Sequence, residues 1–513
     1  MTSDVGIVTP ARVTASYPLT GTWLLFGGLA GMTVAVLADD GVAGYAVFVL
    51  LATIGLTWRR DDPPIFPFIL GYQWLAVTAG YWFEQVTGSF PGLYRPGDTH
   101  HTSLVALTGL LLLALGIRGS YHGLTAWREH RSPVAARSGG TWEIVNIRLL
   151  FVLVIAAYAA DYLWLFNTRL FAGLDVALQR VLDFRQVLLV VLLAEVLRRK
   201  AGYPYLWVAL AWAFVSRLGA YFSDFKSPVI LLLIIYAATF RPWDRQWWPK
   251  SLLAVAKMSP ALVVLVVVLL IWQGGLKHET REAIDNAHTP VTPAERVTTF
   301  AEGVRRDLPQ LFADPEPYVE KLVERLSYIT FLSLVFDYVP SREPHAGGEL
   351  LRMAVTNSTM PRYFFPEKPV LPSDSYYTRR FAGVAVAEEL TSISIGYMAE
   401  FYADWGYGGM WLSIFLYGCW IGMMAAVIRF VNPMPALRSG LLIVAMLVVA
   451  DFEHQFIKGF AALNASVLFL LLLTAVLKPV LTRTLGVRPV VVAGDDGEIV
   501  RSQPVEGARP SFV

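Results

Sequence analysis

The sequence predicts an all-α fold, a polytopic membrane helical bundle of about 12 transmembrane helices with one large, mostly helical external loop. Roughly a dozen apolar stretches approach the ~20 residues that a helix needs to cross a bilayer. A polar stretch of about 130 residues, far longer than an ordinary connection, interrupts them. Hydrophobic residues make up 55% of the chain and charged residues 16%, with a mean hydropathy of +0.50. This composition excludes an ordinary soluble globule.

The apolar stretches, taken in order, place the expected spans. These lie near residues 21–38, 43–57, 65–84, 103–117, 148–167, 186–197, 204–221, 227–240, 252–273, 407–428, 438–452 and 460–477. They divide the chain into a first bundle, 1–273, of about nine spans, a large loop, 274–406, and a second bundle, 407–480, of about three spans. The composition of residues 481–513, with Gly, Asp, Glu, Ser and Pro, predicts a disordered tail.

Basic residues indicate which side of the membrane each connection faces. If the N-terminus is cytoplasmic, every short connection on that side is basic. These connections hold Arg59, Arg60, Arg118, Arg128, Arg131, Arg137, Arg198, Arg199, Lys200, Arg241, Arg245, Lys250, Arg429 and Arg438, and the tail adds Lys478, Arg483 and Arg488. Cytoplasmic connections of membrane proteins carry such an excess of Lys and Arg. We therefore expect both termini in the cytoplasm and the large loop on the extracytoplasmic side.

Composition also limits the chemistry. The formal net charge is only +2, which gives no reason to expect nucleic acid as a partner. Cys419 is the only cysteine, so no intrachain disulfide forms. His100 and His101 share an outer connection with Asp98, but spacing places no third strong metal ligand there. Because the chain also has no Gly-rich phosphate loop and no zinc helix motif, we expect neither a cofactor nor a metal.

The large loop shows the pattern of helices. Thr292 and Glu295 form a capping box with Pro293 at the first helical position, which predicts a helix that ends near Phe312. Residues 315–338 then carry apolar side chains at helical spacing. We expect one amphipathic helix there, lying on the membrane or packed against the spans.

Charged residues interrupt the chain between the seventh and eighth spans. They are Arg217, Asp224 and Lys226, and the span that follows has only about 14 residues, which is short for a crossing. A broken or re-entrant pair of helices is therefore expected, with Arg217 and Asp224 on one face if the helix continues. An arginine inside a membrane is costly and is a candidate functional residue. The alternative is that Arg217 reaches the outer headgroups and Lys226 caps the short span.

Aromatic and basic residues alternate toward the end of the loop. The candidates are Arg362, Lys368, Tyr376, Arg379 and Arg380. Planar side chains stack on sugar rings, and guanidinium groups make paired hydrogen bonds to phosphate oxygens, so this set suits a ligand with sugars and phosphates. A Pro-rich surface turn with ordinary charges explains the same composition equally well.

Acidic residues lie where the loop enters the next span. Glu400 and Asp404 are one helical turn apart and share a face at the outer boundary, with Tyr402 between them. A carboxylate there is either a general base or a marker of the water interface. His454 and Glu453 lie in the last outer connection. They either face the same cavity or belong to a solvated turn.

Two segments add a resemblance to these observations. One is PRYFFPEKP, residues 361–369, and the other is GYMAEFYADWGYGG, residues 396–409. Both resemble the O-antigen polymerase, or oligosaccharide repeat-unit polymerase, family. The interruption at 217–226 and the topology of a dozen spans with one large external loop are also similar, so the resemblance covers most of the chain. The sequence departs from the pattern at 217–219, where it has Arg-Leu-Gly and many members have a Gly-Arg or Lys-Arg pair.

The resemblance implies a metal-independent glycosyltransferase of the C-type superfold in the bacterial cytoplasmic (inner) membrane. It would join undecaprenyl-diphosphate-linked oligosaccharide repeat units outside the cytoplasm, in O-antigen, capsule or exopolysaccharide synthesis. Glu400 would be the base for the acceptor hydroxyl, with Asp224 as second choice and Arg217 as a further catalytic residue. The substrate-binding residues would be Lys226, Arg362, Lys368, Tyr376, Arg379, Arg380, Tyr402 and His454. The partners would be the lipid-linked oligosaccharide, the bilayer and a chain-length regulator protein.

Two other functions are alternatives. A ligase of the same superfold would hand the finished chain to another acceptor, and His454 would then be the expected base. A transporter or flippase of the lipid-linked glycan would need polar residues at the middle of several spans. Asp161 and Glu195 are the main polar residues within spans, whereas most of the others lie at the outer ends of the spans.

Overall fold

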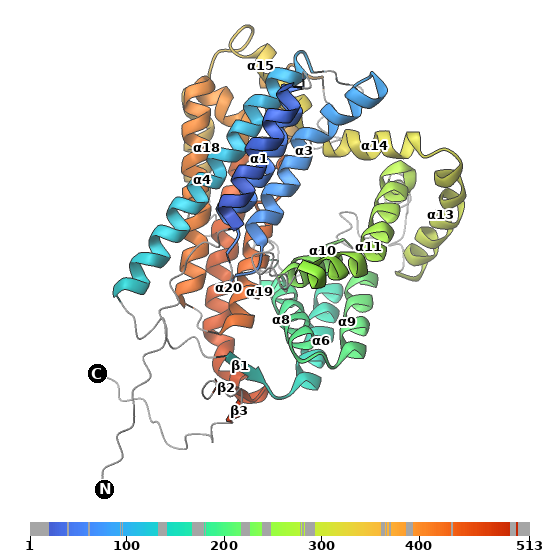
Figure 1. Cartoon of the computed structure of the whole chain (residues 1–513), viewed down its shortest axis with the longest axis vertical. Coiled ribbons are helices and arrows are strands. Elements are labelled where there is room, and N and C mark those ends of the chain that lie inside the picture. The colour runs from blue at the N-terminus through green and yellow to red at the C-terminus, as the bar shows by residue number, and fades with distance from the viewer. Residues whose placement is uncertain are drawn as a thin grey trace.

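A computed structural model of the chain shows a predominantly helical molecule (Figure 1). It describes residues 20–37, 40–59, 62–92, 94, 96–131, 141–166, 179, 181–216, 226–238, 248–277, 279, 282, 293–360, 365, 367–368, 371–385, 393–431, 434–492 and 499–500. The helices of the first bundle are α1 (Thr20–Leu37), α2 (Gly41–Thr57), α3 (Ile65–Thr87), α4 (Thr99–Arg131), α6 (Ile147–Phe166), α8 (Phe184–Arg199), α9 (Tyr203–Val215), α10 (Ser227–Ala237) and α11 (Trp248–Ile271).

A π-helical turn, η3 (Trp272–Leu276), follows α11 and leads into the large loop. The loop contains α13 (Pro293–Ala313), α14 (Glu316–Leu326), α15 (Ile329–Tyr338), α16 (Glu349–Thr359) and α17 (Asp374–Ala382). The second bundle contains α18 (Tyr397–Val431), α19 (Pro435–Leu447) and α20 (Phe456–Thr484). A helix therefore overlaps each of the twelve apolar stretches, and the loop is mostly helical where it is described.

Three helices in the described part of the chain are long and apolar enough to cross a membrane. They are α18, α20 and the part of α4 from Thr99 to Arg128. Several shorter apolar helices, among them α2, α9, α10 and α19, have 10 to 17 residues. These helices indicate a membrane protein, whereas the count of twelve spans stays a prediction.

Glycines allow α4 and α18 to pack closely along the middle of the bundle. A Cβ atom added to Gly116 of α4 would lie 2.3 Å from the carbonyl oxygen of Phe415, and one added to Gly418 of α18 would lie 2.4 Å from that of Leu113. Small residues at such positions let helix backbones approach within a membrane, where van der Waals packing replaces the hydrophobic effect between helices. The two helices form the central pair to which the rest of the second bundle attaches.

Basic residues from distant connections meet where α18 ends. Asp62, between α2 and α3, accepts hydrogen bonds from Arg429 (2.6 Å) and from the hydroxyl of Tyr121 (2.8 Å), and Arg59 lies 3.8 Å away. We call this end of the bundle the basic end, and the end where α18 begins the outer end. Arg59 and Arg429 were both expected on the cytoplasmic side, and the structure brings them to one end.

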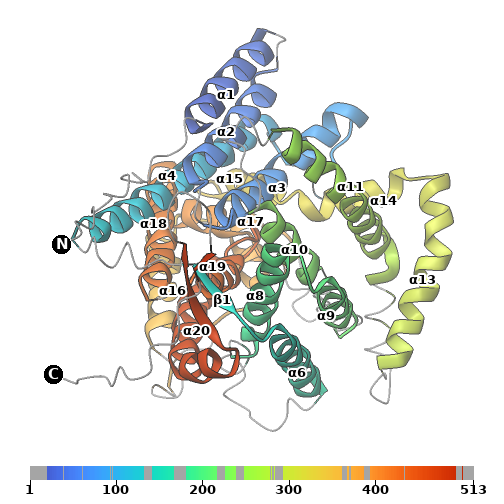
Figure 2. The same ribbon diagram turned by 60° about the horizontal axis from the view of Figure 1, so that its bottom comes forward.

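The expectation of one helix over 315–338 is wrong. The chain leaves helical geometry at Ser327, so α14 and α15 are separate helices. No residue of α14 is buried, whereas α15 buries Ile329, Leu332 and Val335 against the core. The apolar half of the segment therefore packs into the bundle and the charged half stays at the surface. In both views α13 lies at the margin of the molecule away from α18 (Figure 1, Figure 2).

The expectation of a disordered tail from residue 481 is also wrong in part. Helix α20 continues to Thr484, and strand β2 (Val487–Val492) follows it. β2 pairs antiparallel with β1 (Thr141–Ile144), which precedes α6, in the register Ile144↔Val487, and on its other side with β3 (Ile499–Val500). The strand pairing attaches the end of the second bundle to the start of α6. The tail residues 493–498 and 501–513 lie outside the described residues.

Candidate functional site

The candidate site lies at the outer end, around the first part of α18. The backbone of Gly406 has φ 69° and ψ −169°, a conformation that favours glycine and kinks the helix. The kink separates residues 397–405, which we call the α18 head, from the long remainder. The kink at Gly406 directly precedes residue 407, where the sequence predicts that the span begins. Helices α16, α17 and α20 gather around the head, and we call the four elements together the outer assembly.

Glu400 is buried in the α18 head, with 2% of its surface exposed. Its Oε2 accepts a hydrogen bond from the backbone nitrogen of Phe456 at 2.9 Å, and its Oε1 is buried without a hydrogen-bond partner among the described residues. The rings of Phe401 and Phe456 lie 4.6 Å apart beside it. Phe456 is the first residue of α20. Glu400 therefore places a carboxyl group at a helix N-terminus, where it accepts from a free N–H group. Burial raises the pKa of this carboxyl well above its usual value, although the bond from Phe456 lowers it in part.

Asp404, one turn further along, does the same for another helix. Its Oδ1 and Oδ2 accept hydrogen bonds from the backbone nitrogens of Leu350 (3.1 Å) and Leu351 (2.9 Å) in the first turn of α16. Gly348 is the residue that precedes α16 and has φ 89°. Since no side chain of α16 caps its own N-terminus, Asp404 supplies the cap from α18. The two carboxylates of the head thus hold the starts of α16 and α20.

Tyr402 was expected to bind substrate, but only 5% of its surface is exposed. Its hydroxyl donates a hydrogen bond to the carbonyl of Val339 at 3.1 Å. Its ring packs edge-on against Phe336 (4.5 Å between centroids) and Tyr407 (4.8 Å). In this structure Tyr402 is a buried anchor between the α18 head and α15, and a substrate does not reach it.

Arg380, on α17, is held in ion pairs. Its Nε donates to Glu343 at 2.7 Å and its Nη1 to Glu349 at 3.2 Å, and its guanidinium lies over the ring of Phe381. Burial lowers the pKa of Arg380, but the bond to Glu343 and the charge of Glu349 outweigh it and raise this pKa above its usual value. Two carboxylates already meet its charge, so a diphosphate would have to compete with them.

A second ion pair ties α17 to α20. Nζ of Lys458 lies 2.7 Å from Oδ2 of Asp374, the first residue of α17. Tyr377 of the same helix is buried, and burial followed by the charge of Glu400 raises the pKa of its hydroxyl. The interaction with Glu400 shows that α17 and the α18 head lie close together. The outer assembly is thus connected through both backbone caps and ion pairs.

The other predicted binding residues that the structure describes are spread over this end or lie elsewhere. Nζ of Lys368 donates to the carbonyl of Asn357 at 2.7 Å. Arg379 is partly exposed on α17, and Tyr376 is 39% exposed beside Tyr377. The imidazole of His454 is 48% exposed and lies 3.6 Å from Asp451. Lys226 is exposed at the start of α10, outside the outer assembly.

Three central candidates, Arg217, Asp224 and Arg362, lie outside the described residues. The capping contact expected from Thr292 also lies outside them, although α13 does begin at Pro293. The roles of Arg217, Asp224 and Arg362 therefore stay predictions from the sequence.

A polar cleft of about 440 Å³ lies on the loop, between η3 and the helices α13 and α14. Arg306 crosses it with ion pairs to Glu279 (3.0 Å) and Asp307 (2.6 Å). The hydroxyl of Tyr318 donates to Gln310 at 3.2 Å. The rest of its lining includes Asp314 and Lys321. Many polar groups beside one aromatic ring form a surface suited to a saccharide.

Sequence reasoning missed this cleft, although a signal was present. Asp307 and Gln310 of α13 and Asp314, which directly follows it, recur at intervals of three and four residues, so they share one face. The reasoning also missed the bidentate ion pair of Arg325, on α14, with Glu453 in the last outer connection. These two residues are 128 positions apart, so spacing carries no signal for their pairing.

Inside the bundle, the carboxylates expected of a transporter are paired with arginines. Asp161 of α6 lies 3.2 Å from Arg185 of α8, and both side chains are buried. Glu195 of α8 accepts from both Arg198 and Arg199 at 2.6 Å. Removal of one partner of a buried charge pair leaves the other charge uncompensated and strongly destabilises the protein.

Comparison with known proteins gives a family for the chain. A family model described as "Domain of unknown function (DUF8712)" matches residues 142–431, from β1 to the end of α18. No curated protein and no solved structure matches the chain. The matched region holds the large loop and the α18 head, whereas α20, which completes the outer assembly, lies beyond it. Because the match covers more than half of the sequence, the chain belongs to the DUF8712 family.

Proposed function

We propose that this protein is a membrane polysaccharide polymerase that joins lipid-diphosphate-linked oligosaccharide repeat units on the extracytoplasmic side of a bacterial cytoplasmic membrane. The observation that carries the proposal is the arrangement of the segment 396–409, which resembles the polymerase family. Its first part forms the α18 head, in which Glu400 and Asp404 cap α20 and α16. Ion pairs join α17 to these two helices. These contacts hold the helices together at one end of the bundle, so a site formed by them would face one side of the membrane.

The reaction needs two kinds of group. The hydroxyl oxygen of the acceptor sugar bonds to the anomeric carbon of the donor, the bond from that carbon to the diphosphate breaks, and the electron pair leaves on the diphosphate. The hydroxyl proton passes to a carboxylate acting as base. Cationic side chains stabilise the charge that develops on the leaving diphosphate. Arg217, Arg362 and Arg379 are the candidates for these cations.

The structure changes the order of preference for the base. Both carboxyl oxygens of Glu400 are enclosed, since one accepts from Phe456 and the other is buried, so an acceptor hydroxyl does not reach them in this conformation. We therefore assign Glu400 a positioning role at the start of α20. Asp224, beside the cationic residues Arg217 and Lys226 in the sequence, becomes the proposed base.

The polar cleft on the loop supports a glycan substrate. Its lining of Asp307, Gln310, Asp314, Tyr318 and Lys321 offers hydrogen-bond donors, acceptors and one ring to a chain of sugars. We propose that it holds the growing saccharide away from the membrane while the reacting end lies at the outer assembly.

A ligase is the second candidate function, because of one observation. The half-exposed His454 lies beside Asp451 in the last outer connection, and a histidine oriented by a carboxylate is a common general base. In that case His454→Ala would stop transfer of finished chains to their acceptor. For a transporter the structure offers less, because Asp161 and Glu195 are both paired with arginines.

Glycan analysis of a deletion strain distinguishes the three. Surface and lipid-linked glycans would be separated on gels with and without a plasmid that restores the wild-type chain. Loss of the long-chain ladder, with single repeat units on the final acceptor, supports the polymerase. Full-length chains left on the lipid carrier indicate the ligase, and single units that stay on the cytoplasmic side indicate the transporter.

A further inference from the structure

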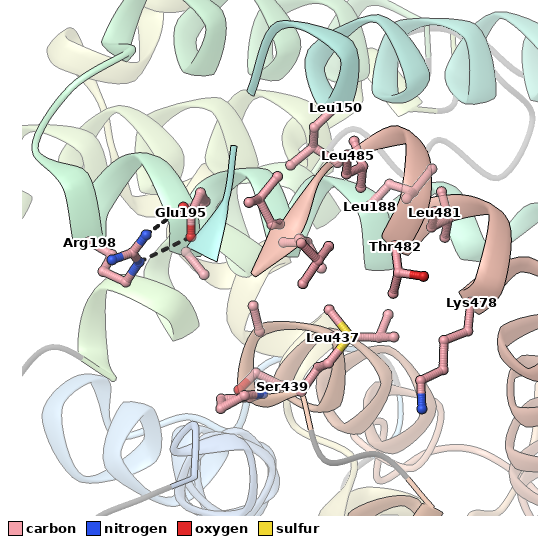
Figure 3. A pocket seen from close by; sticks show the side chains of 17 residues that line it. Leu150, Leu188, Glu195, Arg198, Leu437, Ser439, Lys478, Leu481, Thr482 and Leu485 are labelled. Carbon is pink, nitrogen blue, oxygen red and sulfur yellow. Dashed lines mark hydrogen bonds and ion pairs between the residues drawn. The ribbon is translucent and has the colours of Figure 1, made fainter. Parts of the chain in front are cut away.

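A cavity of about 260 Å³ opens at the basic end of the bundle, beside the last turns of α20 (Figure 3). It is enclosed by α6, α8, α19, α20 and the strands β1 and β2. Aliphatic side chains form most of its wall, including Leu150, Leu188, Val191, Leu437, Leu481 and Leu485. An apolar cavity of this kind takes a hydrocarbon and not a sugar or a nucleotide.

The charged residues of the cavity lie only at its margin. Figure 3 shows Arg198 and Lys478 on opposite sides of the aliphatic lining. Arg198 shares the carboxylate of Glu195 with Arg199, and each of the two arginines donates to it at 2.6 Å. Lys478 of α20 forms no ion pair within the described residues, so it brings a net positive charge to the rim. The hydroxyls of Ser439 and Thr482 also line the cavity and add hydrogen-bonding groups.

The dimensions fit one leaflet of a bilayer. The lining residues Leu188 and Arg198 are ten residues apart on α8, which corresponds to roughly 15 Å along a helix. The hydrocarbon core of a bilayer is ~30 Å thick, so this length is about half of it. Along α8, from Arg198 inward, the lining therefore extends over about the length of one acyl chain in a single leaflet.

We propose that the cavity binds an anionic phospholipid from the leaflet on the side of the basic end. One acyl chain occupies the aliphatic cavity, and the phosphate of the headgroup lies against Lys478. Basic pockets between membrane helices on the cytoplasmic side are suited to anionic headgroups, and each Lys near the surface contributes ~1 kcal/mol to the attraction. The lipid would lie between α8 and α20, both of which also pack against α19.

The test uses the full-length chain in nanodiscs that contain equal amounts of phosphatidylglycerol and phosphatidylethanolamine. Native mass spectrometry after release measures the ratio of the two lipids retained by the protein. We expect the wild-type chain to retain phosphatidylglycerol preferentially, and Lys478→Gln to lower this preference about fivefold, the ratio that corresponds to ~1 kcal/mol. The control is Arg483→Gln, which removes a cation five residues further along α20 that does not line the cavity. We expect it to leave the ratio unchanged.

A second measurement tests the position of the acyl chain. Phosphatidylglycerol with a photoreactive group at the end of one acyl chain should label peptides of α8 and α19, and Ala194→Phe, which fills the cavity, should abolish that labelling. Circular dichroism and thermal unfolding check that this variant is folded, and the Lys478 experiment does not depend on it.

An equal effect of Lys478→Gln and Arg483→Gln overturns the proposal, because the attraction is then a general surface effect. Labelling confined to the C-terminal tail also overturns it, because the chain's own residues then fill the cavity.

Discussion

Glu400 and Phe456, 56 residues apart in the sequence, join α18 to α20 through a bond of 2.9 Å between the Glu400 carboxyl group and the backbone nitrogen of Phe456. This bond places the buried carboxylate at the N-terminus of α20. It explains why an acidic residue lies in an otherwise apolar region without reaching the surface. It also separates two roles, positioning and proton transfer, that the sequence alone does not distinguish.

The first prediction distinguishes these roles. Glu400→Gln keeps one side-chain oxygen that accepts from Phe456, but it has no carboxylate to accept a proton. If Glu400 positions α20, the Gln variant should retain most of the polymer ladder. Glu400→Ala leaves the Phe456 N–H buried without an acceptor and should lower the free energy of unfolding by ~1–3 kcal/mol. Thermal unfolding and gel analysis of the glycans check both variants. Complete loss of polymer in a stable Gln variant would show instead that Glu400 is the base.

The second prediction concerns Asp404 as the cap of α16. Asp404→Ala removes the acceptor for the backbone nitrogens of Leu350 and Leu351 and should cost ~1–2 kcal/mol of stability. Asp404→Asn is the matched control, because Asn caps helices about as well as Asp, and should cost less than half as much. Unfolding temperatures of the purified chains in detergent provide the measurement. Equal losses for the two variants would mean that the negative charge, and not the cap, matters.

The third prediction compares two glycines on α4. A Cβ atom at Gly116 would meet the backbone of α18 at 2.3 Å, whereas one at Gly119 meets nothing within 4 Å. Gly116→Ala should therefore separate the central helices and lower stability by a few kcal/mol, as overpacking does. Gly119→Ala should be neutral or should stabilise the helix by up to ~1 kcal/mol. Both are measured by thermal unfolding in the same detergent, and similar values for the two would refute the close packing of α4 and α18.

The fourth prediction tests the polar cleft on the loop. Tyr318→Ala removes the only aromatic ring among the described residues that line the cleft. It should weaken binding of the isolated repeat-unit saccharide by roughly tenfold, since one ring contact is worth ~1–1.5 kcal/mol. Phe312→Ala is the control, because Phe312 is an aromatic residue on α13 that is 75% exposed and lies outside the cleft. Saturation-transfer NMR with the full-length protein measures the binding. If the two variants bind alike, the saccharide does not lie in the cleft.

The fold could be predicted from the sequence wherever the structure of a segment depends only on the residues of that segment. Each apolar stretch became a helix because hydrophobicity and helical spacing are local, and the kink at Gly406 was marked by the change from polar to apolar residues. The strand β2 was missed because its partner β1 lies over 300 residues earlier. The division between α14 and α15 was missed because the burial of Ile329 and Leu332 depends on helices from other parts of the chain.

For the site, the sequence predicted several of the residues but not the partners that they contact. The sequence drew attention to Glu400, Asp404 and Arg380, and the structure describes all three near one another at the outer end. Their partners are Phe456, Leu351 and Glu343. None of these pairs is within a helical turn in the sequence, so spacing did not reveal that the three groups are already engaged. In the sequence, an exposed cation also cannot be distinguished from one that a carboxylate neutralises.

The most direct test of polymerisation uses the purified full-length protein and the proposed substrate. Single lipid-linked repeat units would be extracted from the deletion strain and added to the wild-type chain in nanodiscs, with the Asp224→Asn variant and the exposed control Arg483→Ala in parallel. The account predicts a ladder of lipid-linked products that differ by one repeat unit, together with free lipid diphosphate, from the wild type and Arg483→Ala, and no ladder from Asp224→Asn. Unchanged single units with the folded wild-type protein would contradict it.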